Sequence, residues 1–395
     1  MKDIKIASIP FLTLIFIIFP MLTTDETGSM GVLVWGGLLL FSVIFSLKEP
    51  IRKRTWPYLA ILMWFFGVFS TVISPYGEIG HDVIKYLAFV LLLITLSNNH
   101  YEKKDFYIAS VIYSIVSIVL AILIILSFIY GYPHVDSVFE GDIRFSIGIT
   151  GIYKNPNYIG AFINLCTFVL LYILFFSKVK LWYKVIILAF ISLMVFAIIL
   201  TGTRAAIITL VSSVFLLFLY NSRKKRFFII KYLPFIVLVV LGFYYAEDLS
   251  EFFDAFGSGR GGFTSDVRSE SWDFALKKLK GSLLFGYGIN SWNGIKTDSL
   301  LPGLHNNFLE FFLNQGIIGL ILLLITMFSG WKKVKKEDKF FVAILCFVNI
   351  FPLMFQNGLI DVTFWRVVLI NRIIIDYSSY SEKGVIALFD FNRNG

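Results

Sequence analysis

The residues best suited to chemistry begin with His305, one of only four histidines in the 395 residues. Asn306 follows it directly, and after nine more residues come Gly316 and, three positions on, Gly319. An unperturbed imidazole titrates near about pH 6.5, so it can accept the proton of a hydroxyl group at neutral pH. The alternative is an interfacial histidine with local hydrogen bonds only. The pattern therefore nominates His305 as a general base.

Arginine is the second candidate type, because a guanidinium can form two parallel hydrogen bonds to phosphate oxygens. Arg204 follows the short turn 201–203 and begins an apolar segment, so it is either an anion clamp or an arginine that snorkels to the membrane surface. Arg268 falls in the first turn of an expected helix, where exposed backbone N–H groups favour anions. Its alternative is a local ion pair with Asp266 or Glu270.

Three weaker candidates for substrate contact are Arg144, Arg260 and Asn306. Arg144 is a candidate because of its charge, since cations are unusual in loops expected on the external side of a membrane. Arg260 lies in the glycine-rich stretch 257–262, which resembles a phosphate-binding nest but lacks the strand-loop-helix context of a nucleotide site. A flexible loop is the simpler interpretation of that stretch.

Two ionisable residues, Asp361 and Arg366, fall inside the last apolar segment. Such residues are functional candidates, yet their near one-turn spacing also permits a structural ion pair. No spacing typical of a zinc site occurs, and Cys166 and Cys346 lie inside apolar segments as expected of buried free thiols. Neither a metal nor a cofactor is expected.

The composition determines which elements must position these residues. The chain is 57% hydrophobic and 15% charged, with a mean hydropathy of +0.80, whereas soluble domains carry roughly 25% charged residues. Long apolar runs recur throughout, so we expect an integral membrane protein surrounded by membrane lipids. The net charge of +9 is concentrated in short loops and does not form a nucleic-acid-binding face.

Runs of bilayer length predict an all-α polytopic protein with about twelve transmembrane helices, since roughly 20 apolar residues cross a membrane. The expected spans are 5–22, 30–47, 57–74, 82–97, 106–130, 158–176, 183–201, 204–220, 228–246, 306–329, 339–355 and 358–376. No internal repeat interrupts this pattern, so we expect a single integral membrane domain over 1–395.

Lysine and arginine concentrate in alternate loops, which places those loops and both termini in the cytoplasm. Two long segments then fall on the external side, at 131–157 and 247–304. Long loops within a compact domain are commonly functional. The larger loop contains an expected amphipathic helix near 266–280, with apolar positions Val267, Ala275, Leu276 and Leu279 spaced for one face.

The ordered set of motifs resembles the bacterial O-antigen ligase and O-antigen polymerase superfamily. The turn and helix start at 201–206 (Thr-Gly-Thr-Arg-Ala-Ala) is similar to that family's T/S-x-T/S-R-A turn. Residues 268–275 and the G-x-G at 286–288 resemble its arginine-bearing loop helix and the glycines that follow it. His305-Asn306 with Gly316 and Gly319 completes the set. The resemblance is strongest over 155–320.

The resemblance implies a donor in which a glycan is attached to polyprenyl pyrophosphate. It further implies that Arg204 and Arg268 bind the pyrophosphate and that His305 is the base on the acceptor hydroxyl. Direct displacement would invert the anomeric carbon without a metal, on the periplasmic face of the bacterial inner membrane.

The acceptor remains open at this point. A ligase of lipopolysaccharide biosynthesis would use a lipid A core sugar, whereas an O-antigen or capsule polymerase would use a lipid-linked repeat unit. The spacing after His305 favours the ligase. A polysaccharide transporter or flippase is the rival class. Against it stand the absence of a visible repeat and the few charged residues in mid-span positions.

Overall fold

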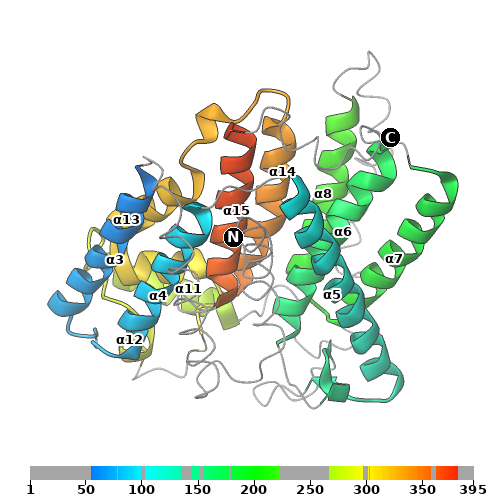
Figure 1. Ribbon diagram of the computed structural model, residues 1–395. Helices are drawn as coiled ribbons and strands as arrows, with labels where there is room; N and C mark the ends of the chain where they lie inside the picture. Colours follow the sequence, from blue (N-terminus) through cyan, green and yellow to red (C-terminus); the bar gives the residue numbers. More distant parts are fainter. Residues whose placement is uncertain are drawn as a thin grey trace, which may run out of the picture. The chain divides into compact units, whose positions relative to one another are not determined.

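The computed structural model describes residues 55–77, 79–98, 103–134, 144–150, 155–177, 179–222, 267–296, 301, 303–356 and 362–380. Within these ranges the regular structure is helical apart from two short paired strands (Figure 1). The predicted spans 5–22, 30–47 and 228–246 lie outside them. The chain divides into two compact units.

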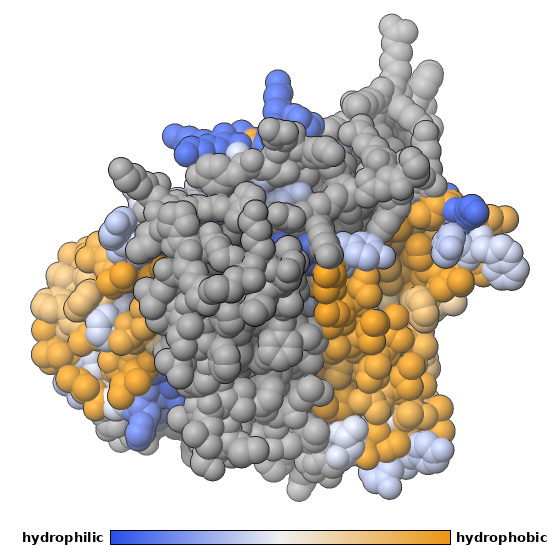
Figure 2. Space-filling view, in the orientation of Figure 1, coloured by the Kyte–Doolittle hydropathy of each residue, from blue (hydrophilic) through white to orange (hydrophobic). Residues whose placement is uncertain are grey.

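Five of the described helices are long and apolar enough to cross a bilayer. They cover Trp56–Ile73, Asp105–Ile129, Pro156–Phe176, Leu181–Leu200 and Asn307–Lys333. Figure 2 shows apolar side chains over the outer surface of α3 (Trp56–Ile73) and over α5 (Lys103–Ile129) and α7 (Leu181–Leu200). The chain is therefore an all-α integral membrane protein, as predicted. The total of twelve spans stays a prediction.

Every predicted span within the described ranges coincides with a helix. In addition to the five above, these are α4 (His81–Asn98), α8 (Arg204–Ser222), α14 (Lys339–Ile350) with the 3-10 turn η4 (Phe351–Phe355), and α15 (Val362–Tyr380). The hydropathy pattern located these helices to within a few residues, because an unbroken apolar run leaves the backbone no alternative hydrogen-bonding partner in a membrane.

Unit 1 is built around α13 (Asn307–Phe328), which packs against α3, α15, α11 (Val267–Leu279) and α12 (Ser291–Ile295). The helix α11 confirms the one expected near 266–280. Its buried positions include Ala275 and Leu279, but Leu276 is half-exposed. Placing Leu276 on the same face was wrong, because the buried positions follow a spacing of four and position 276 points away from that line.

Helix directions in unit 1 follow from contacts near the helix ends. The ring of Tyr86 near the start of α4 packs in a tilted arrangement on Trp365 near the start of α15, with ring centroids 5.4 Å apart. Phe311 near the start of α13 lies against Phe364 near the start of α15. Arg372, near the middle of α15, hydrogen-bonds the carbonyl of Ser329 just after α13 and lies 4.9 Å from the ring of Trp56, which begins α3. Thus α4, α13 and α15 share one direction and α3 opposes it. The charge pattern predicts these same relative directions; the side that faces the cytoplasm stays a prediction.

Arg372 closes the end of α13 where the last helical carbonyls lack intrahelical partners. Its guanidinium donates to the carbonyls of Thr326, at 3.3 Å, and Ser329, and it pairs with Asp376 one turn later. Arg372 is 1% exposed. A buried cation needs such partners, because an uncompensated charge in this setting is strongly destabilising.

Replacing Arg372 by Met is expected to lower the free energy of unfolding by about 3 kcal/mol or more, since Asp376 would lose its buried partner. Thermal unfolding in lipid nanodiscs would measure the change. Lys332→Met is the matched control, because Lys332 is an exposed cation near the same helix end. Equal melting temperatures for the two variants would contradict the structural role of Arg372.

Unit 2 contains the second part of α5 with α6 (Pro156–Phe176), α7 and α8; the helix α6 packs against both α7 and α8 (Figure 1). Described parts of the predicted loop 131–157 form structure that the sequence did not indicate. Its strands β1 (Pro133–His134) and β2 (Arg144–Phe145) pair antiparallel, with His134 opposite Arg144, and a 3-10 turn follows at Gly148–Thr150.

Candidate functional site

His305 in unit 1 lies immediately before the cap of α13. Its backbone has φ 48°, a left-handed conformation that non-glycine residues seldom adopt and that histidine adopts more readily than most. Leu304 before it is buried, whereas His305 is partly exposed. The side-chain oxygen of Asn306 accepts hydrogen bonds from the backbone nitrogens of Phe308, at 3.1 Å, and Leu309, at 3.0 Å. The histidine therefore sits between two fixed residues and remains accessible.

Asn306 was predicted as a possible substrate contact, and the structure gives it a capping role. The side-chain oxygen satisfies two of the backbone N–H groups that begin every helix without an intrahelical partner. That role fixes the backbone next to His305, so the His-Asn pair has a local structural reason. Contact of Asn306 with a substrate stays a prediction.

Trp272 ties helix α11 to the residue that precedes His305. Its indole nitrogen donates a hydrogen bond of 2.6 Å to the carbonyl of Leu304. Arg268 lies one helical turn before Trp272 in α11. The structure therefore brings the helix that contains Arg268 against the backbone of the His305 segment, two parts of the chain that the sequence separates by more than thirty residues.

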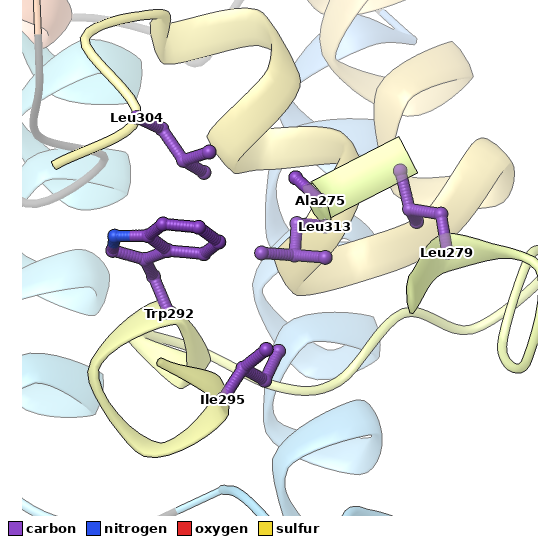
Figure 3. Packing of buried hydrophobic residues seen from close by; sticks show 6 residues of the cluster. All are labelled: Ala275, Leu279, Trp292, Ile295, Leu304 and Leu313. Atoms are coloured by element: carbon purple, nitrogen blue, oxygen red, sulfur yellow. The ribbon is translucent and has the colours of Figure 1, made fainter. Parts of the chain in front are cut away.

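A buried apolar cluster holds these pieces together (Figure 3). Its members are Ala275, Leu279, Trp292, Ile295, Leu304 and Leu313. The ring of Trp292 faces Leu313, with Leu304 on one side and Ile295 on the other. Because a fully buried large apolar side chain contributes about 1.5–3 kcal/mol, the cluster fixes α11 and α12 against the first half of α13. Because Leu304 belongs to the cluster, the packing also supports the backbone directly before His305.

Changing Trp272 to Phe should preserve most of the packing while it removes the hydrogen bond to Leu304. We expect the free energy of unfolding to fall by about 1 kcal/mol. If His305 acts in catalysis, its misplacement should also lower the turnover rate about tenfold. Parallel measurements of melting temperature and turnover test this. The control is Trp182→Phe, at an exposed tryptophan of unit 2; identical behaviour of both variants would rule out the positioning role.

Gly316 interrupts α13 with φ 62° and ψ −169°, a combination open almost only to glycine. The segment 282–288 fills the break. Tyr287 and Gly288 donate their backbone N–H groups to the carbonyls of Leu313 and Asn314, both at 2.8 Å. In return Ile317 donates to the carbonyl of Leu283 at 2.9 Å. The G-x-G motif at 286–288 and Gly316, the tenth residue of α13, are therefore the two sides of one contact.

Close backbone approach explains the glycines on both sides of this contact. A Cβ on Gly286 would lie 2.5 Å from the backbone nitrogen of Gly316, and one on Gly288 would lie 2.6 Å from the Cα of Thr71 in α3. Gly319 has a different surrounding, because an added Cβ there would meet the Gln315 side chain of its own helix, with the Cβ atom nearest. The loop is thus inserted between α3 and α13.

Polar side chains on the buried face of α13 were not identified from the sequence. Asn314 accepts a hydrogen bond from Ser291 at 3.0 Å, and the Gln315 amide donates to the Tyr86 hydroxyl at 3.0 Å. Both carboxamides are fully buried. The available signal was an Asn-Gln pair in the middle of an apolar span, where polar residues are unusual. They join α13 to α12 and α4.

Arg204 begins α8 in unit 2, directly after the tight turn that the sequence predicts. Gly202 has φ 58°. The Thr203 hydroxyl donates to the Pro156 carbonyl of α6 at 3.2 Å, and Thr201 and Thr203 are themselves hydrogen-bonded at 2.9 Å. The two buried threonines hold the turn against α6, and the side chain of Arg204 is partly exposed.

Arg144 lies against the same turn. It is 4% exposed, and a Cβ on Gly202 would lie 2.9 Å from its Cγ. Its guanidinium donates to the side-chain oxygen of Asn157 at 3.4 Å. Asn155 caps α6, because its side-chain oxygen accepts a hydrogen bond from the Asn157 backbone nitrogen at 2.9 Å. The structure therefore brings Arg144 next to the turn that presents Arg204.

Arg268 is the second residue of α11, in the first turn as predicted. Arg366 is buried in α15. Arg260 and Asp361 lie outside the described residues, so the ion pair between Asp361 and Arg366 stays a hypothesis. Among the side chains that the structure describes, no group of three or more His, Cys, Asp or Glu is arranged to hold a metal ion.

The fold and these motifs define a polytopic α-helical membrane protein with a histidine-bearing helix start and an arginine-bearing turn. Comparison with known families adds that residues 189–324 match the family model described as O-Antigen ligase. The predicted resemblance is confirmed for this part of the chain, which contains Arg204, Arg268, His305 and Gly316.

Similarity to individual proteins is more limited in extent. A protein of Rickettsia conorii (strain ATCC VR-613 / Malish 7) named as a candidate polysaccharide ligase is 32% identical over 112 residues. The aligned stretch covers 24% of this chain and 26% of that protein. No solved structure matches the chain.

Proposed function

We propose that this protein is a glycosyltransferase of the ligase type that acts on a lipid-linked glycan, most specifically an O-antigen ligase of lipopolysaccharide biosynthesis. The donor is a glycan on polyprenyl (undecaprenyl) pyrophosphate, and the acceptor is a sugar hydroxyl of a lipid A core. The observation that carries the proposal is His305, an accessible histidine with fixed neighbours at a helix start, inside the segment that matches the ligase family.

In the proposed reaction the acceptor hydroxyl oxygen attacks the anomeric carbon of the donor glycan. His305 takes the hydroxyl proton as general base. The bond between the anomeric carbon and the pyrophosphate oxygen breaks, and its electron pair leaves with polyprenyl pyrophosphate. Direct displacement from the opposite face inverts the anomeric centre. The donor is already activated, so the reaction requires no nucleotide.

Charge develops on the pyrophosphate as it leaves, and cationic side chains would stabilise it. We assign this role to Arg204 and Arg268, with Arg144, Arg260 and Asn306 as further candidates for substrate contact. The location of Arg144 against Gly202 supports its inclusion, because a buried guanidinium beside the Arg204 turn adds positive charge there. Since arginines can supply this stabilisation, the proposal includes no metal and no cofactor.

The cellular setting follows from the same proposal. Lipid pyrophosphate-linked glycans for surface polymers are used on the periplasmic side, so the site would face the periplasm, in the bacterial inner membrane. The expected orientation, with both termini in the cytoplasm, agrees with it. The match to an O-antigen ligase model and a relative named for polysaccharide ligation both favour the ligase.

Product analysis separates the ligase from its alternatives. Purified protein in liposomes would receive a lipid pyrophosphate-linked glycan with either lipid A core or further lipid-linked repeat units. Glycan on lipid A core supports the ligase. Longer lipid-linked chains would indicate an O-antigen or capsule polymerase. Translocation of the donor without any transfer would indicate a transporter or flippase and would refute the enzyme proposal.

Substitution of Arg204 tests the proposed anion-binding role. Arg204→Ala should lower kcat/KM for the donor about a hundredfold, as loss of one charge-stabilising donor does in other sites. Arg204→Lys should retain part of the activity, because lysine keeps the positive charge but cannot form the two parallel hydrogen bonds of a guanidinium. Lys184→Ala is the control. Lys184 is a cation near the start of α7, at the end of that helix away from the turn that precedes Arg204. Full activity of Arg204→Ala with the lipid donor would exclude the assignment.

A further inference from the structure

The segment 282–288 belongs to the long loop predicted as external, yet it contacts α3 well inside that helix. The ring of Phe285 stacks on Phe66 with centroids 5.8 Å apart and meets Phe69 edge-on at 5.8 Å. Phe66 lies seven residues before Ile73, the last residue of α3. At a rise of 1.5 Å per residue, the contact is about 10 Å below the helix end.

The contact with α13 gives a similar depth. Ile317 donates its backbone N–H to the Leu283 carbonyl, and Gly316 beside it is the tenth residue of α13. Nine residues of helix correspond to about 14 Å. Both α3 and α13 have the length and hydropathy of membrane spans. The segment therefore reaches a level where a bilayer around these helices is hydrocarbon.

The side chains of the segment suit that environment. Leu283 and Leu284 are each 53% exposed, and Phe285 is 36% exposed. They continue the outer face of α3, where Leu62, at 51%, and Phe65, at 58%, are also exposed. Three consecutive exposed apolar residues are unfavourable in water, but they extend a lipid-facing helix surface without a break.

Much of the segment's backbone is hydrogen-bonded within the protein, which suits a location in hydrocarbon, where an unpaired N–H or C=O group is costly. The Leu283 carbonyl accepts from Ile317, and the nitrogens of Tyr287 and Gly288 donate to the break in α13. Gly286 donates to the Ser282 carbonyl at 2.8 Å, and the Ser282 hydroxyl donates to the Gly286 carbonyl at 2.7 Å. For these backbone groups, partners within the protein take the place of water.

We propose that residues 282–288 form a re-entrant loop that enters the membrane, with Leu283, Leu284 and Phe285 in contact with the acyl chains of bilayer lipids. The break in α13 at Gly316 then provides the free backbone groups to which the loop hydrogen-bonds. This role is independent of the reaction that the protein catalyses. It explains why the segment pairs with α13 through main-chain atoms and leaves its large apolar side chains outward.

Site-directed spin labelling tests the proposal in full-length protein reconstituted in lipid bilayers. One nitroxide is attached at Leu284→Cys, in a background where the buried Cys166 and Cys346 are replaced by Ala. Leu62→Cys on α3 is the hydrocarbon reference, with nearly the same exposure. Asn293→Cys on α12, exposed and in the same predicted loop, is the aqueous reference. Accessibility to oxygen and to a water-soluble nickel chelate is measured at each site.

At position 284 we expect high accessibility to oxygen and loss of accessibility to the chelate, close to position 62 and unlike position 293. Chelate accessibility equal to that of position 293 would overturn the proposal. Shielding from both reagents would also overturn it, since another protein surface would then cover the loop. If the label loses mobility only when polyprenyl phosphate is added, the surface binds a prenyl chain and not bulk lipid, and the proposal is overturned.

If the Cys-free background does not fold, the same three positions can be labelled in the wild-type background, where both native cysteines are buried. Protein without an added cysteine then gives the background signal. A polar substitution provides a second readout. Leu284→Asp should lower the melting temperature in bilayers more than Asn293→Asp does, because only the first would bring a carboxylate into hydrocarbon. Equal melting temperatures would contradict the re-entrant loop.

Discussion

Replacing His305 by Asn should lower glycan transfer by about a hundredfold to ten-thousandfold, the usual contribution of a positioned general base. Asparagine is the informative replacement here, because it tolerates the left-handed backbone of this position and retains hydrogen-bonding groups. It has no atom that accepts a proton at neutral pH. The initial rate of transfer from a lipid pyrophosphate-linked glycan, measured with purified protein, provides the test.

The structure supplies two controls for this substitution. His305→Gly also fits φ 48° and removes the side chain altogether, so it should be as inactive as His305→Asn. His81→Asn changes an exposed histidine at the start of α4 in the same unit and should leave transfer unchanged. Melting temperatures close to that of the wild type would show that the variants are folded. A His305→Asn protein with more than half of the wild-type rate would contradict the assignment of the base.

The second large effect is expected at Gly316. Its backbone conformation is strained for any residue with a Cβ, and an added Cβ would overlap the Leu284 carbonyl of the inserted loop. Gly316→Ala should therefore destabilise the protein by about 3 kcal/mol or more, because the strain and the loss of the loop contact add. Yield after membrane extraction and the melting temperature of any folded fraction measure this loss.

Gly80→Ala is the matched control for Gly316→Ala, because a Cβ at Gly80 would meet no atom within 4 Å. The control should behave as wild type. If Gly316→Ala is as stable as Gly80→Ala, the break in α13 and its pairing with the loop are not as described. The same comparison at Gly286, where a Cβ would reach the backbone of Gly316 from the opposite side, should give a loss similar to that of Gly316→Ala.

Helix positions could be predicted from the sequence because they depend on one strong local signal. The expected span 57–74 coincides with α3 at Trp56–Ile73, and 306–329 coincides with α13 at Asn307–Phe328. In each case a long apolar run in a membrane must form a helix, because only a helix pairs the backbone groups of a single segment within that segment. The relative helix directions were also predictable, because they alternate along the chain and leave their record in the loop charges.

The interior of the site was less predictable, because its contacts join residues far apart in the chain. Gly286 and Gly316 were noted as separate motifs, and nothing in either pattern indicates that one inserts against the other. The hydrogen bond from Trp272 to Leu304 likewise joins two residues with no periodic relation. Such contacts are determined by tertiary packing, which hydropathy and helical spacing do not encode.

Arg144 illustrates an intermediate case. A cation in a predicted external loop is unusual under the positive-inside rule, and that signal alone nominated it. Its location against Gly202, however, depends on the pairing of strands β1 and β2. Two-residue strands have too little periodicity to be detected in a sequence. The charge of Arg144 was enough to make it a candidate, but its contact with Gly202 could not be predicted.

The most direct test of the account is a single-turnover transfer assay with purified protein, a polyprenyl pyrophosphate-linked glycan and a lipid A core acceptor. The wild type is predicted to release one polyprenyl pyrophosphate for each glycan that appears on the acceptor, with inverted configuration at the new linkage. The His305→Asn protein, folded and able to bind the donor, should release almost none. Transfer by His305→Asn at the wild-type rate would contradict the proposed mechanism, and absence of transfer by the folded wild type to any sugar acceptor would contradict the proposed function.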